Sequence, residues 1–199
     1  MIVARWAPDA RARLETAALD LFLDNGYEET TVTQIAHRAG LNRATFFRHF
    51  ADKREVLFGG EDVLTGLFAE AINAVPVGAT LTQCLQAALA AADAVMTPQQ
   101  RAKAAKRVQI LAGNPEVRER SLLKHARIAN SIIAVLRDRG VDELTARLGA
   151  QIAMLAFSVA FECWMNAATD EPFGPFADAA LSALQTRAAE LGPPCDLGA

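Results

Sequence analysis

Two short helical segments joined by a tight turn restrict what residues 31–50 can fold into. The stretch "TVTQIAHRAG" begins with Thr31 and Gln34 at capping-box spacing and ends at Gly40, and "NRATFFRHF" follows after one further residue. Helices of this length are unstable alone in water, so each must pack against the other and against a neighbouring helix. The pattern predicts a helix-turn-helix.

The other segments of the 199-residue chain also repeat apolar residues at helical spacing, and no window alternates β-branched residues as a strand would. We therefore predict an all-α protein. An N-terminal three-helix domain with the helix-turn-helix occupies residues 1–52, and a C-terminal helical domain for ligand binding and dimerisation occupies residues 53–199. Turn and capping signals divide the chain into about nine helices, expected near residues 9–25, 31–40, 43–50, 52–74, 80–97, 99–112, 115–139, 142–169 and 173–190.

Charge is distributed unevenly along the chain, although its net value is only −3. Residues 101–139 contain ten Lys or Arg against three Asp or Glu, whereas the segments on either side are acidic. The whole-chain average therefore does not exclude a nucleic-acid partner. The basic excess fits either a solvated face or an attraction for an anionic ligand such as an acyl-CoA or a fatty acid.

The sequence contains no signature of catalysis or metal binding. Its cysteines, Cys84, Cys163 and Cys195, are odd in number and far apart, and its three histidines are scattered. A nucleophile elbow, a P-loop and a dinucleotide-binding glycine motif are also missing. We expect a protein that is not an enzyme and uses no cofactor or metal. Its first residues lack a signal-peptide core, and Ser158 and Glu162 interrupt its longest apolar run, so we expect a cytoplasmic protein without a membrane span.

The second helix of the motif carries the side chains expected to read DNA. In a helix-turn-helix this helix lies in the major groove, with its first residues at the base edges. Arg43 can donate a bidentate pair to guanine, and Ala44 or Thr45 can contact a thymine methyl group. Phe46 and Phe50, four residues apart, are expected to hold the helix against the core.

The stretch "TTVTQIAHRAGLNRATFFRHFADKREVL", preceded by "ALDLFLDNGYE", resembles the DNA-binding domain of the TetR family of bacterial transcriptional regulators. The resemblance covers residues 10–58 without a gap. It rests on residues that stand where the family motif has them, namely Gly26, Thr31, Ala36, Gly40, Thr45, Phe50 and Lys53. It implies a homodimer that reads a palindromic operator, with two recognition helices roughly 34–36 Å apart.

The resemblance also implies roles for individual residues. Contacts to the phosphate backbone would be made by Thr31, Thr33, Phe47, His49 and Lys53. Contacts to bases or adjacent phosphates would be made by Asn42, Arg43, Ala44 and Thr45. The family usually has a tyrosine at the position of Phe47, so the hydroxyl that would bind a phosphate is missing here and the ring can offer only apolar contact.

In this family the helices after the DNA-binding domain form a ligand pocket and a dimer interface. The apolar helix 142–169 and the segment 173–190 are expected to build an intersubunit four-helix bundle. The expected pocket residues, for which a plain hydrophobic core is the alternative, are Leu85, Leu89, Val108, Leu111, Ile128, Phe157, Phe161 and Trp164. One polar stripe of helix 142–169 fits solvent, the pocket or the dimer interface, and consists of Arg147, Gln151, Ser158, Glu162 and Asn166.

Glycines interrupt the helix expected at residues 52–74. Gly59, Gly60 and Gly66 each cost about 1 kcal/mol in a helix relative to alanine. In the family this helix links the pocket to the DNA-binding domain. We interpret Gly59-Gly60 as a hinge through which ligand binding changes the spacing of the two recognition helices. Close helix packing or a break in the helix are the alternatives.

Together these patterns predict a dimeric TetR-like transcriptional regulator, a repressor that a small, largely apolar or acyl-type molecule releases from its DNA operator. The alternative is an architectural or protein-partnered DNA-binding factor without a small ligand. Ligand in the pocket or ligand-dependent release from DNA would support the first function, and a collapsed core would support the second.

Overall fold

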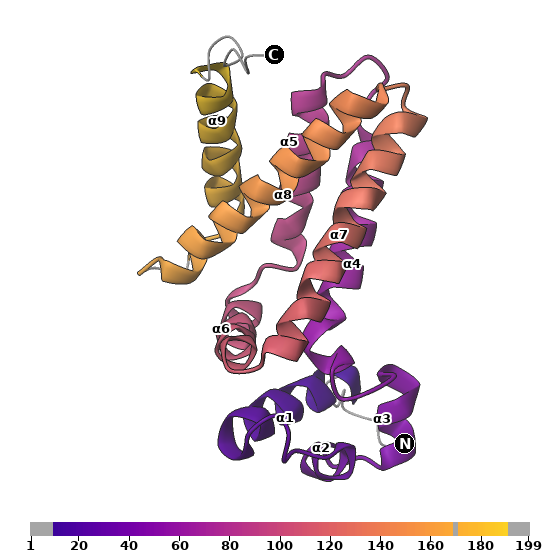
Figure 1. Ribbon diagram of the computed structural model, residues 1–199, viewed down its shortest axis with the longest axis vertical. Helices are drawn as coiled ribbons and strands as arrows, with labels where there is room; N and C mark the ends of the chain where they lie inside the picture. Colours follow the sequence, from indigo (N-terminus) through magenta and orange to yellow (C-terminus); the bar gives the residue numbers. More distant parts are fainter. Residues whose placement is uncertain (1–9, 169–170, 191–199) are drawn as a thin grey trace, which may run out of the picture. The chain divides into compact units, whose positions relative to one another are not determined.

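The computed structural model describes residues 10–168 and 171–190, which form helices joined by turns, with no strand among them (Figure 1). The helices are α1 (Ala10–Asn25), α2 (Val32–Arg38), α3 (Arg43–His49), α4 (Glu55–Ala74), α5 (Leu81–Ala91), the 3-10 turn η1 (Ala92–Ala94), α6 (Pro98–Ala112), α7 (Pro115–Asp138), α8 (Glu143–Asn166) and α9 (Gly174–Glu190). The all-α prediction is confirmed. The helix expected at 80–97 is shorter, because α5 ends at Ala91 and the chain tightens into η1. Cys195 lies outside the described residues.

Side-chain caps begin both short helices of the motif. The Thr31 hydroxyl accepts a hydrogen bond from the backbone N–H of Gln34 at 3.3 Å, and the Gln34 side chain accepts one from the Thr31 N–H at 2.8 Å. Asn42 begins α3 by accepting the N–H of Thr45 at 2.8 Å. Between the helices, Gly40 has a φ of 66°, a left-handed conformation that glycine adopts without a steric penalty. The capping box and the turn therefore form as the sequence predicted.

The chain divides into two compact units whose boundaries differ from the predicted domains. The first unit comprises Met1–Val63 and Gln99–Lys124, and the second comprises Leu64–Pro98 and His125–Ala199. Helix α6 therefore belongs to the unit that contains the helix-turn-helix, although a boundary at residue 52 assigned it to the C-terminal domain. Helices α4 and α7 contribute residues to both units.

The core of the first unit is built around α1. Leu14 and Ala18 of α1 are completely buried, as is Phe46 of α3. Ile110 of α6 and Val117 of α7 belong to the same cluster of buried residues. Burying one large apolar side chain contributes about 1.5–3 kcal/mol. Packing of this kind stabilises α2 and α3, which are too short to be stable alone.

Ion pairs join α6 to α1 within the first unit. The Glu15 carboxylate accepts hydrogen bonds from Lys103 at 2.6 Å and from Arg107, and Asp20 accepts one from Lys106 at 2.5 Å. Burial lowers the pKa of Arg107 to about 10, so its guanidinium stays protonated at neutral pH. Part of the basic excess of residues 101–139 is thus neutralised by α1.

Helix α8, in the second unit, turns its small residues inward and exposes large ones. The buried side consists of Ala146, Gly149, Ala150, Ala153, Ala156, Ala160 and Trp164. A Cβ atom at Gly149 would lie 3.0 Å from a methyl group of Leu81, so α8 approaches α5 closely. By length and composition α8 could span a membrane, a test that core helices of soluble proteins also pass, and it packs against both α9 and α5.

Candidate nucleic-acid interface

The N-terminal end of α3 is exposed and carries a positive charge. Asn42, Arg43 and Ala44 are all exposed. The Arg43 guanidinium carbon lies 5.4 Å from the centroid of the Phe47 ring, a cation–π distance that keeps the charge near the helix surface. Arg43 and Ala44 therefore present the groups expected at base edges.

Thr45 does not project into solvent as predicted, because it is only 7% exposed. Its hydroxyl donates a hydrogen bond to Oδ1 of Asn42 at 3.0 Å and accepts one from Arg48 at 3.3 Å. The prediction of an exposed Thr45 side chain at the start of the helix is therefore wrong. Its role in the structure is to fix the Asn42 cap, and the Asn42 side-chain oxygen is engaged in that cap.

Aromatic residues attach α3 to the core on one side and leave one ring outside. Phe46 and Phe50 are buried with ring centroids 5.5 Å apart, as their spacing of four residues predicted. Phe47 is 46% exposed and its ring meets that of Phe46 edge-on, with centroids 5.5 Å apart. The exposed ring is thus held in place and available for apolar contact.

The remaining predicted DNA contacts lie in different environments. Thr31 and Thr33 are exposed at the start of α2, although the Thr31 side chain also takes part in the capping box. His49 is half-buried at the end of α3, and its backbone carbonyl accepts a hydrogen bond from Arg11 at 3.1 Å. The side chains of the two threonines are accessible, whereas His49 is more enclosed than a surface residue would be, and all three phosphate contacts stay predictions.

Lys53 does not extend freely into solvent. Its ammonium group donates to the backbone carbonyls of Tyr27 at 2.8 Å, Glu28 at 3.1 Å and Thr30 at 3.4 Å. It also lies 4.4 Å from the centroid of the Tyr27 ring. These contacts give Lys53 a structural role, in which it fastens the loop between α1 and α2, and its contact with a phosphate stays a prediction. Its position in the sequence could not reveal that three carbonyls converge on it.

Sequence reasoning overlooked other residues that shape this surface. Thr30 is buried, and its hydroxyl lies within hydrogen-bonding distance of the carbonyls of Leu21, at 3.1 Å, and Gly26, at 2.8 Å. Arg11 and Arg13 of α1 bind backbone carbonyls of the motif. The available signal was indirect, since short helices leave carbonyls without intrahelical partners at their C-terminal ends.

The predicted pocket residues fall into two groups. Six belong to the hydrophobic core of the second unit: Leu85, Leu89, Ile128, Phe157, Phe161 and Trp164. The other two belong to the first unit. Val108 is 52% exposed, and Leu111 packs against the core around α1. Helix α6, which carries Val108 and Leu111, packs within the first unit, whereas the other six residues belong to the second.

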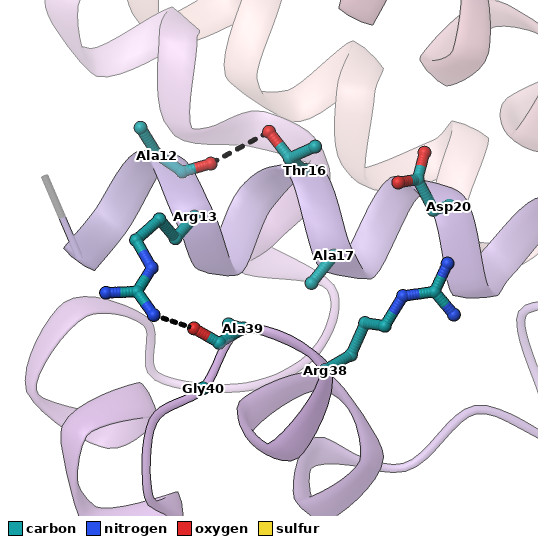
Figure 2. A pocket seen from close by; sticks show the side chains of 8 residues that line it. All are labelled: Ala12, Arg13, Thr16, Ala17, Asp20, Arg38, Ala39 and Gly40. Carbon is teal, nitrogen blue, oxygen red and sulfur yellow. Dashed lines mark hydrogen bonds between the residues drawn. The ribbon is translucent and has the colours of Figure 1, made fainter. Parts of the chain in front are cut away.

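Aromatic rings of the second unit contact one another and form an aromatic cluster, which consists of Phe68, Phe157, Phe161, Trp164 and Phe173. Phe157 lies 5.8 Å from Phe68, 6.3 Å from Phe161 and 5.4 Å from Phe173, measured between centroids, and Trp164 lies 5.8 Å from Phe173. Two open grooves lie on other described residues, one on α9 and one between α1 and the end of α2 (Figure 2). The ring contacts show that the aromatic cluster is packed as part of the core.

The polar stripe of α8 is exposed in the single chain. Its members are Arg147, Gln151, Ser158, Glu162 and Asn166. Arg147 donates to Glu143 at 2.6 Å within the same helix. Because these side chains are exposed, the stripe faces solvent or a subunit interface and not the interior of the second unit.

We predict that Lys53→Ala lowers the free energy of unfolding by about 2 kcal/mol, because charge-assisted hydrogen bonds to the loop carbonyls are lost. Arg43→Ala should change it by less than about 0.5 kcal/mol, because Arg43 is exposed. Urea-induced unfolding followed by circular dichroism measures both values. Equal effects of the two substitutions would contradict the structural role of Lys53.

Comparisons with known proteins find matches to the N-terminal part of the chain. Residues 15–58 match the family model described as bacterial regulatory proteins of the tetR family. The regulator TcmR of Streptomyces glaucescens is 41% identical over 81 residues, which cover 41% of this chain and 36% of TcmR, about a third of that relative's length.

Solved structures share the fold over nearly the whole chain. The TetR-family repressor FadR of Thermus thermophilus, in complex with lauroyl-CoA, aligns with 95% of this chain and 99% of its own, at a TM-score of 0.55 and 24% identity. FadR of Bacillus subtilis, in complex with stearoyl-CoA, aligns with 87% of this chain and 96% of its own, at a TM-score of 0.55 and 18% identity. Residues 15–58 therefore match the helix-turn-helix of tetR-family regulatory proteins, and the helical fold of the chain is the fold of the two FadR structures.

Proposed function

We propose that the protein is a cytoplasmic repressor that binds a palindromic operator as a homodimer and leaves it when an acyl-type molecule binds. The observation that carries the DNA-binding part is the exposed N-terminal end of α3, where Arg43 and Ala44 face outward while Phe46 is completely buried. A short helix anchored on one side and charged at its free end is suited to the major groove.

Arg43 is the proposed base-reading residue. Its guanidinium can donate two hydrogen bonds to the O6 and N7 atoms of a guanine. Ala44 beside it can contact a thymine methyl group, and Thr31 and Thr33 on α2 can bind phosphate oxygens. Phe47 lacks a hydroxyl, so its exposed ring is assigned apolar contact with a sugar or a base.

An exposed apolar stripe on α8 is the proposed contact between two subunits. Its members are Leu144, Leu148, Leu155 and Val159, which are 76%, 58%, 51% and 37% exposed. Spacings of four and seven place them on one face of the helix. Helix α9 packs beside α8 and exposes a run of small residues, Ala179, Ser182, Ala183 and Thr186. Large side chains of one subunit can fill the small-residue face of the other, and a twofold axis repeats this contact.

The polar stripe that includes Glu162 shares the same side of α8. On the proposed interface these side chains belong at the rim, where water can solvate the carboxylate. A carboxylate at the centre would need a partner charge, because burying it alone costs several kcal/mol.

We expect Leu148→Glu to convert the dimer to monomers, raising the dissociation constant about 100-fold or more, because an unpaired carboxylate would be buried at the contact. Leu123→Glu on α7 is the matched control, since Leu123 is exposed to a similar extent, 61% against 58%, and lies outside the stripe. Sedimentation velocity over a range of concentrations measures both variants. A Leu148→Glu protein that remains as dimeric as Leu123→Glu would refute the interface.

The aromatic cluster of the second unit is the proposed effector site. Both FadR proteins with the same fold were solved with an acyl-CoA bound. Phe157 and Phe161 are only partly buried against the core of the second unit, whereas Leu85, Leu89 and Ile128 of the same core are almost completely buried. An acyl chain would enter by separating the partly buried rings. The filled state of the cluster also favours the second candidate function, a DNA-binding factor that needs no small ligand.

Helix α4 is the proposed link between effector and DNA. It continues as one helix from Glu55 to Ala74, through Gly59 and Gly60. Among the described residues, nothing lies within 4 Å of a Cβ atom built at Gly66, so close packing does not require a glycine there. Gly59-Gly60 is the proposed hinge, because consecutive glycines leave the helix easy to bend.

Release from DNA tests the effector and the hinge together. The full chain is bound to a duplex that it has selected from random-sequence DNA, and lauroyl-CoA or stearoyl-CoA is added. Wild type should dissociate. The double variant Gly59→Ala/Gly60→Ala should gain up to about 2 kcal/mol of stability and need at least roughly tenfold more acyl-CoA for release.

Gly66→Ala is the control for helix stabilisation alone, and it should gain about 1 kcal/mol without changing release. Equal release in the double variant and in Gly66→Ala would contradict the hinge. Persistent binding of wild type at saturating acyl-CoA would contradict the effector class and support the ligand-independent factor.

A further inference from the structure

Both short helices of the DNA-binding motif end at a carbonyl that is bound by an arginine of α1. The C-cap of α2 is Ala39, and the last residue of α3 is His49. Helices leave their last carbonyls without intrahelical partners, and the C-terminal end carries partial negative charge. Arg13 donates to the Ala39 carbonyl and Arg11 donates to the His49 carbonyl. Helix α1 therefore binds the C-terminal ends of both α2 and α3 through two arginines.

Arg13 fits closely against the turn between α2 and α3. Figure 2 shows its guanidinium pointing across the groove from α1 to the Ala39 carbonyl. A Cβ atom at Gly40 would lie only 2.8 Å from Nη2 of Arg13, and Gly40 has a positive φ. The glycine thus serves both the turn and the approach of the arginine.

Arg11 makes a second kind of contact at the far end of α3. Its Nη1 lies 3.1 Å from the His49 carbonyl, and its guanidinium carbon lies 4.7 Å from the centroid of the Phe50 ring. The base-reading end of α3 is opposite, about 10 Å away along a seven-residue helix. A small displacement at the Arg11 end would tilt Arg43 and Ala44 relative to the base edges.

We infer that Arg11 and Arg13 are positioning residues, which set the orientation of the recognition helix without contacting phosphate. Basic residues of a DNA-binding domain are ordinarily assigned to the phosphate backbone. Here both guanidinium groups are directed at helix-end carbonyls of the domain itself. Their loss should therefore reduce discrimination between sequences and leave the electrostatic part of binding unchanged. The inference rests on the proposed reading of DNA by α3.

The test compares Arg11→Met and Arg13→Met with wild type in the full chain. Dissociation constants are measured for a selected operator and for a random duplex between 50 and 300 mM NaCl, at least about 20 °C below each unfolding midpoint. Under these conditions a loss of global stability does not change the ratio of the two constants, because nearly all molecules are folded. The ratio therefore reports positioning and not stability.

We expect the operator constant to rise about tenfold, the random-duplex constant to change less than about twofold, and the slope of log K against log salt to stay the same. Arg38→Met is the matched control, because Arg38 lines the same groove from α2 (Figure 2) and its loss removes the same charge. Its operator-to-random ratio should remain that of wild type. Arg11→Lys, which keeps a cationic donor, should recover part of the discrimination.

A slope that falls by about 0.9 for each contact removed, with equal weakening on both duplexes, would identify phosphate contacts and overturn the inference. Unchanged binding to both duplexes would overturn it as well. If Arg13→Met does not fold, the test of positioning depends on Arg11→Met and Arg11→Lys. A wild-type protein that selects no sequence at all would instead overturn the proposed function.

Discussion

Burial of α1 is the constraint on which the DNA-binding unit depends. Helices α2 and α3 have seven residues each, too few to be stable alone, so their orientation is determined by what they pack against. Leu14 and Ala18 supply the buried surface that Phe46 meets, and Arg11 and Arg13 bind the ends of the two short helices. The same helix binds α6 through Glu15 and Asp20. The orientation of α3 and the attachment of α6 are thus fixed by one element.

The second unit is organised by the distribution of side-chain size on α8. Alanine and glycine on the inner face let α8 lie close to α5 and α9, and the leucines of the outer face stay exposed among the described residues. Exposed apolar stripes of this kind mark interaction surfaces in soluble proteins. The exposed stripe on α8 supports the proposed dimer.

Local signals in the sequence were sufficient to predict the helices and the turn of the motif. Thr31 with Gln34, Asn42 before α3, and Gly40 between them each act within a few residues, so the fold class and the outward position of Arg43 could be predicted. The burial of Thr45 and the carbonyl contacts of Lys53 depend on segments far apart in the chain, which spacing does not reveal. For the same reason spacing did not show that α6, with Val108 and Leu111, packs in the unit that contains the helix-turn-helix.

Selection of bound duplexes from random-sequence DNA by the full chain is the most direct measurement of whether α3 reads DNA. We expect an enriched sequence with two inverted half-sites about 10 base pairs apart, each with a guanine whose preference disappears when the selection is repeated with Arg43→Ala. Failure to enrich any sequence would contradict the reading of DNA by α3, as would an enriched sequence unaffected by the loss of Arg43.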